Sequence, residues 1–217
     1  MKNDLDLQRD VFDELKWEPA VHSTNIGVIV KDGVVTLEGV VDSYPEKWAA
    51  ERAAKRVSGV KALALELEVK LPGSGEQTDA DIAEAAESAL RWDILAPQDR
   101  IKVTVEKGFL TLEGEVDWEY QRSAAKKAVL NLTGVKGVAN EITVKPNVAP
   151  IDVKAKIEAA LKRNAILDAE QIHVQADGGK VTLSGCVSSW AERDEAEAAA
   201  WSAPGVSEVK DVIAVTY

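Results

Sequence analysis

A nine-residue motif that occurs three times constrains this chain more than any other feature of its sequence. The motif occupies residues 33–41, 108–116 and 179–187. A leucine lies 18 residues before the first glycine of each copy, and a Gly-Val pair follows 20 residues after the second glycine. Because these registers are kept in all three copies, the sequence predicts three homologous units, roughly residues 1–70, 79–145 and 151–217.

The periodicity of apolar residues changes from helical to strand-like within each unit. Residues 79–92 place apolar side chains on one side at helical spacing, and residues 101–106 alternate as in a half-buried strand. A glycine-containing turn then favours a hairpin, an alanine-rich segment such as 46–57 favours a second helix, and residues 63–69 favour a closing strand. The order αββαβ predicts an α+β fold, in which each unit is a two-layer domain with a three-stranded mixed sheet covered on one face by two helices.

Nine glycines are expected to serve the backbone rather than a ligand. Those at the hairpin turns permit a positive φ, and those inside the second strand allow another backbone or a helix to approach closely. No Gly-Lys-Ser/Thr sequence and no Gly-x-Gly-x-x-Gly turn is present, so the sequence indicates no phosphate-binding loop. The structural glycines are Gly33, Gly108 and Gly179 at the turns, Gly39, Gly114 and Gly185 in the strands, and Gly59, Gly134 and Gly205 in the later Gly-Val pairs.

The residues described so far resemble a known family, the BON domain. The resemblance rests on the αββαβ order, on the Gly-x-Val-x-Leu-x-Gly strand and on the later Gly-Val pair before the closing strand, and it covers almost the whole chain in three copies. The BON domain is a small bacterial module of osmotically induced envelope proteins and membrane-associated proteins, and it is generally thought to bind phospholipid or membrane surfaces. The resemblance therefore implies a non-enzymatic binding module. The first unit departs from the pattern, with Leu65 where the others have Asn140 and Asp211.

The chain carries few residues of the kinds that catalysis and metal binding use. A single cysteine, Cys186, excludes an internal disulfide and a multi-cysteine metal site, and its role is not indicated. His22 and His173 have no cysteine, histidine or acidic partner at ligand spacing. We therefore expect no catalytic residue, no metal site and no cofactor. The net charge of −11 also disfavours nucleic acid as a partner.

Tryptophan is the unusual residue class, with six copies in the chain. Trp17 and Trp92 end the first helix of their units, where the third unit has Arg163, so partial exposure is expected. Trp118 and Trp190 lie in the loop that precedes the second helix. Such rings suit membrane surfaces and protein interfaces, and packing within or between domains is an open alternative.

The outward face of the first predicted sheet is more apolar than its two counterparts. Ile29, Val34 and Val40 lie on it, whereas the other copies place charged and polar residues there. An exposed apolar patch usually marks a contact. The sequence therefore predicts an interface at this face, either with a neighbouring domain or with a second copy of the chain in a homo-oligomer.

The location and partners follow from the lack of any long apolar segment. The longest stretch without a charge, residues 19–30, is short of the roughly 20 apolar residues of a membrane span, and the N-terminus is acidic where an export signal is basic and apolar. We expect a cytoplasmic protein as written, or a periplasmic one if a leader was removed before Met1. The resemblance to the BON domain, together with the loop tryptophans, implies peripheral association with phospholipid or membrane surfaces in envelope or osmotic stress. The alternatives are a cytoplasmic protein-interaction or assembly module and a small-solute or potassium sensor.

Overall fold

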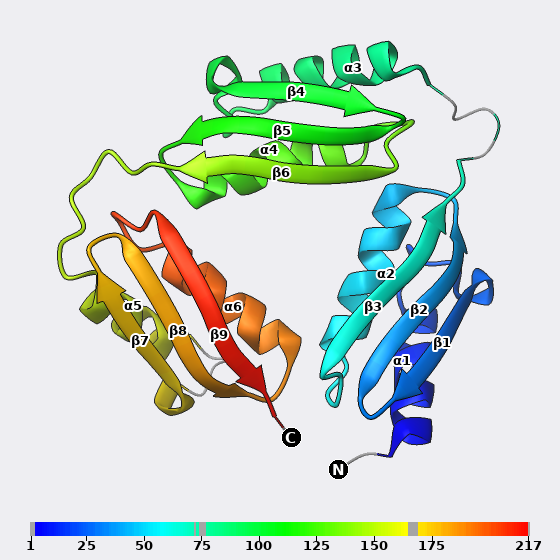
Figure 1. Ribbon diagram of the computed structural model, residues 1–217, viewed down its shortest axis with the longest axis horizontal. Helices are drawn as coiled ribbons and strands as arrows, with labels where there is room; N and C mark the ends of the chain where they lie inside the picture. Colours follow the sequence, from blue (N-terminus) through cyan, green and yellow to red (C-terminus); the bar gives the residue numbers. More distant parts are fainter. Residues whose placement is uncertain (1–2, 72, 74–76, 165–168, 217) are drawn as a thin grey trace.

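The computed structural model describes residues 3–71, 73, 77–164 and 169–216. In this part of the chain, nine strands form three sheets of three strands each, in the orders β1-β2-β3, β4-β5-β6 and β7-β8-β9 (Figure 1). The first two strands of each sheet are antiparallel and the last two are parallel. The predicted α+β fold with mixed three-stranded sheets is confirmed.

The three repeats contain the same elements in the same order. The first consists of α1 (Asp4–Trp17), β1 (Ile26–Lys31), β2 (Val34–Val41), α2 (Tyr44–Arg56) and β3 (Ala62–Val69). The second consists of α3 (Asp79–Trp92), β4 (Ile101–Glu106), β5 (Phe109–Val116), α4 (Glu119–Leu130) and β6 (Gly137–Val144). The third consists of α5 (Val153–Arg163), β7 (Ile172–Asp177), β8 (Lys180–Val187), α6 (Trp190–Trp201) and β9 (Glu208–Val215). A 3-10 turn precedes the first strand of each sheet, at Ser23–Asn25, Gln98–Arg100 and Ala169–Gln171.

Each repeat has its own hydrophobic core between its two helices and one face of its sheet. In the first repeat, Leu7, Val11 and Leu15 of α1 lie a helical turn apart and are fully buried against Val35 and Leu37 of β2. The second helix contributes buried alanines, which let it lie close to the sheet. The opposite face of every sheet is left to solvent.

Helix starts are fixed by local hydrogen bonds. Ser43 Oγ accepts a hydrogen bond from the Glu46 amide, and Ser189 Oγ accepts one from the Glu192 amide. In a capping box, the glutamate would accept a hydrogen bond from the amide of the N-cap serine itself. Here Glu46 and Glu192 accept instead from the amides of Asp42 and Ser188, the residues just before the serines. The second repeat does the same with an uncharged Gln121, so this role does not need a negative charge.

The strand glycines lie where another backbone leaves no room for a side chain. Gly39 has a φ of 130°, and a Cβ added there would lie 2.1 Å from the carbonyl oxygen of Asn25. Gly114 and Gly185 show the same close approach, to Arg100 and Gln171. Any larger residue at these positions would force the 3-10 turn away from the sheet.

The hairpin turns differ between the repeats, and the expectation for Gly179 is wrong in one respect. Gly33 and Gly108 have φ values of 80° and 81°, but in the third repeat the positive φ lies at Gly178 and Gly179 lies outside that region. Gly179 is still constrained, because a Cβ there would lie 2.5 Å from the carbonyl oxygen of Gly205.

An aspartate at the start of the first helix holds the turn in two of the repeats. The Asp4 carboxylate accepts hydrogen bonds from the amides of Asp32 and Gly33, and Asp79 accepts them from Lys107 and Gly108. The third repeat has Pro150 at the equivalent position, which has no carboxylate to offer. This difference accompanies the altered backbone conformation at Gly179.

The three repeats lie at the corners of a triangle, with α2, α4 and α6 on the inner sides of the sheets (Figure 1). The start of α2 lies against the second repeat, the start of α4 against the third, and the start of α6 against the first. These contacts run head to tail and close into a ring within one chain. The joint at residues 71–78 lies partly outside the described residues.

Candidate functional site

The junction between the third and first repeats is closed by Trp190, the first residue of α6. Its indole packs against the core of the first repeat, and Nε1 donates a hydrogen bond of 2.8 Å to the carbonyl oxygen of Val60. Two cations flank the ring, with the Arg193 guanidinium 4.8 Å and Lys55 Nζ 5.8 Å from its centroid. Trp190 is therefore not a free surface contact, and the alternative of packing between domains describes it.

Asp194 is an acidic residue partly buried in the same junction. Burial raises the pKa of Asp194, which lies on α6 one turn after Trp190, although the positive charges of Lys55 and Arg193 oppose this effect. Lys55 also lies 2.8 Å from Glu51. The contact between α2 and α6 is thus an aromatic ring surrounded by charges of both signs.

The junction between the first and second repeats uses Tyr44, the first residue of α2. Tyr44 occupies the position of Trp190 and packs against the core of the second repeat. Burial raises the pKa of its phenol, and a hydrogen bond with the Val138 backbone partly offsets the shift. An aromatic side chain thus starts the second helix and packs against the neighbouring core at two of the three junctions.

The junction between the second and third repeats has Glu119 at this position. Its carboxylate is 3.2 Å from the Arg122 guanidinium and accepts a hydrogen bond of 3.1 Å from Ser123 Oγ. Burial raises the pKa of Glu119, Arg122 and Ser123 oppose the shift, and the nearby charge of Glu197 adds to it. Trp201, in the last turn of α6, packs against the cores of both repeats, and the Arg122 guanidinium lies 5.8 Å from its ring centroid.

A cavity of about 620 Å³ opens at this third junction. Aromatic and hydroxyl side chains surround Glu119 there: Trp118, Tyr120, Ser123, Trp201 and Ser202. Trp118 and Tyr120 are stacked with their ring centroids 6.4 Å apart. We refer to this space as the Trp118–Trp201 cavity.

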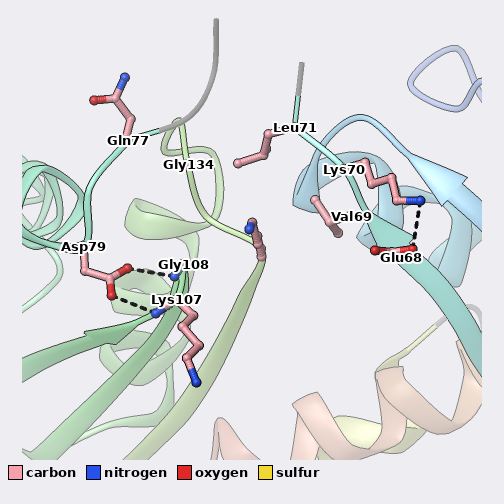
Figure 2. A pocket seen from close by; sticks show the side chains of 10 residues that line it. Glu68, Val69, Lys70, Leu71, Gln77, Asp79, Lys107, Gly108 and Gly134 are labelled. Atoms are coloured by element: carbon pink, nitrogen blue, oxygen red, sulfur yellow. Dashed lines mark hydrogen bonds and ion pairs between the residues drawn. The ribbon is translucent and has the colours of Figure 1, made fainter. Parts of the chain in front are cut away.

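A second cavity, of about 610 Å³, lies between the first and second repeats (Figure 2). Its lining is polar and of mixed charge, with Lys70, Lys107 and Lys136 beside Glu68 and Asp79. Lys70 Nζ lies 3.2 Å from Glu68, and the Asp79 carboxylate is directed at the hairpin turn that it holds. Within this lining, only Lys70 and Glu68 form an ion pair among the described residues.

The most exposed apolar segment of the described residues follows α3. Trp92 is 87 % exposed and Ile94 is 97 % exposed, and Leu95 beside them is half exposed. The loop has a defined turn, because Asp93 Oδ1 accepts a hydrogen bond of 2.8 Å from the Leu95 amide and Ala96 is buried beneath it. Trp17 projects in the same way from the end of α1, with 82 % of its surface exposed.

The apolar outer face of the first sheet is not covered by another repeat. Ile29 and Val34 are 49 % and 41 % exposed, and Val40 is half-buried. Among the residues that the structure describes, no neighbouring repeat covers Ile29 and Val34, and contact with a second copy of the chain stays a prediction. The corresponding face of the third repeat carries the exposed His173 and the half-buried Cys186.

The expectation that His22 lacks an acidic partner is wrong. His22 Nδ1 lies 3.0 Å from Glu46 Oε1, and the His22 amide donates to the same oxygen. Among the described residues, His22, Asp42 and Glu46 bring donor atoms within 4.8 Å of one another, as a metal site requires. The Glu46 oxygens, however, already accept hydrogen bonds from the amides of His22 and Asp42, and the cluster is accounted for by this capping role.

In the second and third repeats, a polar residue at the position of Leu65 hydrogen-bonds the last strand to the second helix. Asn140 donates to the carbonyl oxygen of Arg122, and Asp211 accepts from Arg193 Nε at 2.6 Å. In the first repeat Leu65 packs against the core instead, and Lys47 Nζ donates to the carbonyl oxygen of Leu67. The departure at Leu65 is therefore compensated by a different link between the same elements.

These features define a class of protein, a tandem array of small two-layer α+β modules whose second helices pack end to end. The family model of the BON domain matches residues 3–70, 78–146 and 152–217. The chain belongs to the BON domain family, which is not known to be catalytic. In the part of the chain that the structure describes, no helix has the length and apolar character needed to span a bilayer.

Individual proteins are similar to this chain over different extents. Osmotically-inducible protein Y of Escherichia coli (strain K12) is 33 % identical over 129 residues, which are 58 % of this chain and 64 % of that protein. Among solved structures, the C-terminal domain of CdsD, a structural protein of the type III secretion system of Chlamydia trachomatis, covers 100 % of both chains with 14 % identity and a TM-score of 0.27. The PrgH periplasmic domain has 12 % identity and a TM-score of 0.21, and covers 89 % of this chain and 96 % of that chain.

Proposed function

We propose that this chain associates peripherally with phospholipid surfaces of the bacterial envelope under osmotic stress and catalyses no reaction. The observation that carries the proposal is the loop after α3, with Trp92, Ile94 and Leu95 exposed on an ordered turn. Membership of the BON family and the similarity to an osmotically inducible protein support the same function.

The loop has the side chains that enter the interfacial region of a bilayer. An indole is stable at the boundary between headgroups and acyl chains, and Ile94 and Leu95 would bury apolar surface there. Complete burial of three such side chains releases on the order of 5 kcal/mol before the costs of association. Because the Asp93 turn already orders the loop, little additional conformational entropy is lost on insertion.

Electrostatics favours a weakly charged surface as the partner. The net charge of −11 opposes the approach to anionic lipid, so binding is expected to depend on apolar insertion and only weakly on salt. Arg91, which is exposed beside Trp92, provides one local positive charge.

Co-sedimentation with vesicles tests the proposal. We expect the protein to sediment with phosphatidylethanolamine–phosphatidylcholine vesicles at 50 and 500 mM NaCl, with a blue shift of tryptophan emission. The double variant Trp92→Ala, Ile94→Ala should lose binding by at least about tenfold. Ile29→Ala, which removes an exposed apolar side chain elsewhere, should bind as the unchanged protein does. Absence of binding, or equal binding of the double variant, would refute the proposal.

A second candidate function is protein interaction through the outer face of the first sheet. The exposure of Ile29 and Val34 on neighbouring strands favours it, because these residues form an uncovered apolar patch. Ile29→Lys should reduce the mass measured by light scattering if two copies meet there. An unchanged mass at unchanged stability would exclude this face as a contact between copies.

A further inference from the structure

The Trp118–Trp201 cavity lies at the junction where the second repeat breaks the pattern of the other two. At the junctions that begin with Tyr44 and Trp190, an aromatic ring from one repeat packs against the next. At the third junction the equivalent residue is Glu119, and an open cavity of about 620 Å³ lies beside it. This volume is within the range of small-molecule sites.

The walls of the cavity are aromatic and come from two repeats. Trp118 and Tyr120 belong to the start of α4, and Trp201 belongs to the end of α6. Aromatic faces attract cations, most strongly those that are bulky and weakly hydrated. The Arg122 guanidinium near the Trp201 ring shows that a cation is already accommodated at this edge.

The charges at the junction leave an excess of one negative charge. The carboxylates of Glu119 and Glu197 are opposed by the single guanidinium of Arg122. Glu119 is only 20 % exposed, so its charge is poorly screened by water. A ligand that brings a positive charge would stabilise this carboxylate.

The hydrogen-bonding groups decide which kind of cation fits. A primary ammonium has three N–H donors and needs three acceptors. The lining offers few, since Glu119 accepts from Ser123 Oγ and pairs with Arg122, and Ser202 Oγ is directed at the Ala198 carbonyl oxygen. Most of the remaining wall is aromatic. A methylated ammonium has no such need and presents methyl groups to the rings.

We propose that the Trp118–Trp201 cavity binds a small organic cation with a methylated ammonium group. Trp118, Tyr120 and Trp201 contact the methyl groups, and Glu119 provides the opposing charge. The site is distinct from the exposed loop at Trp92. The ammonium could come from a free solute or from a choline headgroup, which share this chemistry.

Titration with tetramethylammonium chloride and with choline, followed through the indole N–H resonances, tests the site. We expect saturable shifts of the Trp118 and Trp201 signals at millimolar concentrations, with the Trp17 and Trp92 signals unchanged. Sodium chloride at equal ionic strength and 3,3-dimethyl-1-butanol, the uncharged analogue of choline, should cause no saturable shift. Saturation by the uncharged analogue, or no saturation by either cation, would overturn the proposal.

Two variants test separately the contributions of the Glu119 charge and of an aromatic ring to binding. Glu119→Gln and Tyr120→Ala should each weaken binding by about five- to tenfold. Tyr120 is half exposed, so its removal is not expected to unfold the protein. Glu87→Gln, which changes an exposed glutamate on α3, should bind as the unchanged protein does. Unchanged affinity in both Glu119→Gln and Tyr120→Ala would exclude the cavity.

Vesicles distinguish the two sources of the cation. If the headgroup binds, phosphatidylcholine vesicles should displace tetramethylammonium and phosphatidylglycerol vesicles should not. If a free solute binds, neither kind should displace it. The double variant Trp92→Ala, Ile94→Ala should keep its affinity for free choline, so failure of the membrane proposal and failure of this one are separately visible.

Discussion

The junctions on the two sides of the third repeat are built from the same helix positions and have different outcomes. Between the third and first repeats, Trp190 fills the contact and donates to the carbonyl oxygen of Val60. Between the second and third repeats, Glu119 takes that position and a cavity is present. The two junctions thus differ in the first residue of the second helix and in the space beside it, on a shared backbone.

At both junctions an aromatic ring lies near a cation, but the ring and the cation come from opposite ends of the second helices. At the sealed junction the ring of Trp190 comes from the start of a second helix and the cation of Lys55 from near the end of another. At the open junction the cation of Arg122 comes from the start and the ring of Trp201 from the end. The pairing of an aromatic ring with a cation is kept, whereas the space around it is not.

The largest effect is expected when the sealed junction is opened. Trp190→Ala removes the indole and its hydrogen bond to Val60, and should lower the free energy of unfolding by about 2–4 kcal/mol. Urea denaturation measures this loss, and small-angle scattering should show a larger radius as the first and third repeats separate. Trp92→Ala, at an exposed tryptophan, should change stability by less than about 0.5 kcal/mol. Equal effects of the two variants would show that Trp190 does not hold the ring closed.

A smaller loss is expected at the junction of the first and second repeats. Tyr44→Ala should cost about 2 kcal/mol, because a half-buried ring is removed from the second core. Tyr44→Phe keeps the ring and should cost under about 1 kcal/mol, the value of its hydrogen bond. The two variants are compared by urea denaturation. If Phe is as damaging as Ala, the hydroxyl rather than the ring makes the contact.

Converting the open junction into a sealed one should raise stability. Glu119→Tyr places in the second repeat the residue that the first repeat has at this position, and should gain about 1 kcal/mol through burial of the ring. The same change should abolish the binding of tetramethylammonium. Thermal unfolding and the indole titration give the two readouts. A less stable variant would mean that Trp201 leaves no room for a second ring.

The smallest effect concerns the charge of Glu119 and depends on pH. Its pKa is raised in the folded protein, so ionisation is less favourable there than in the unfolded chain. The favourable contribution of the protonated form is complete below the unfolded pKa and is lost as the pH rises through the folded pKa. Glu119→Gln should therefore be slightly more stable than the unchanged protein at pH 7, and the difference should vanish below the unfolded pKa of the carboxyl group. Denaturation curves from pH 3.5 to 7.5 test this, and a difference independent of pH would contradict it.

Features that depend on neighbouring residues were predictable from the sequence. The αββαβ order follows from apolar periodicity, and the close approach at Gly39 follows from a glycine within a strand pattern. Gly178 has the positive φ that Asp32 and Lys107 have at the same position, whereas Gly179 lacks the positive φ of Gly33 and Gly108. The glycine at this position permits a positive φ but does not require it.

Features that join distant segments were not predictable in the same way. Trp190 and Val60 are 130 residues apart, and His22 and Glu46 are 24 residues apart, so no local spacing indicates either pair. One signal was nevertheless present in the sequence. Alignment of the repeats places Tyr44, Glu119 and Trp190 at one position, and the change from aromatic to acidic residue marks the junction that is open.

Because the start of each second helix lies against the next repeat, the three repeats cover one another's contact surfaces in a closed ring. A fragment of two repeats would leave uncovered both the surface of the first repeat that accepts Trp190 and the start of α4. Deleting the third repeat should thus expose two surfaces that are covered in the three-repeat array. The presence of three repeats therefore has a geometric consequence, because three head-to-tail contacts close this ring.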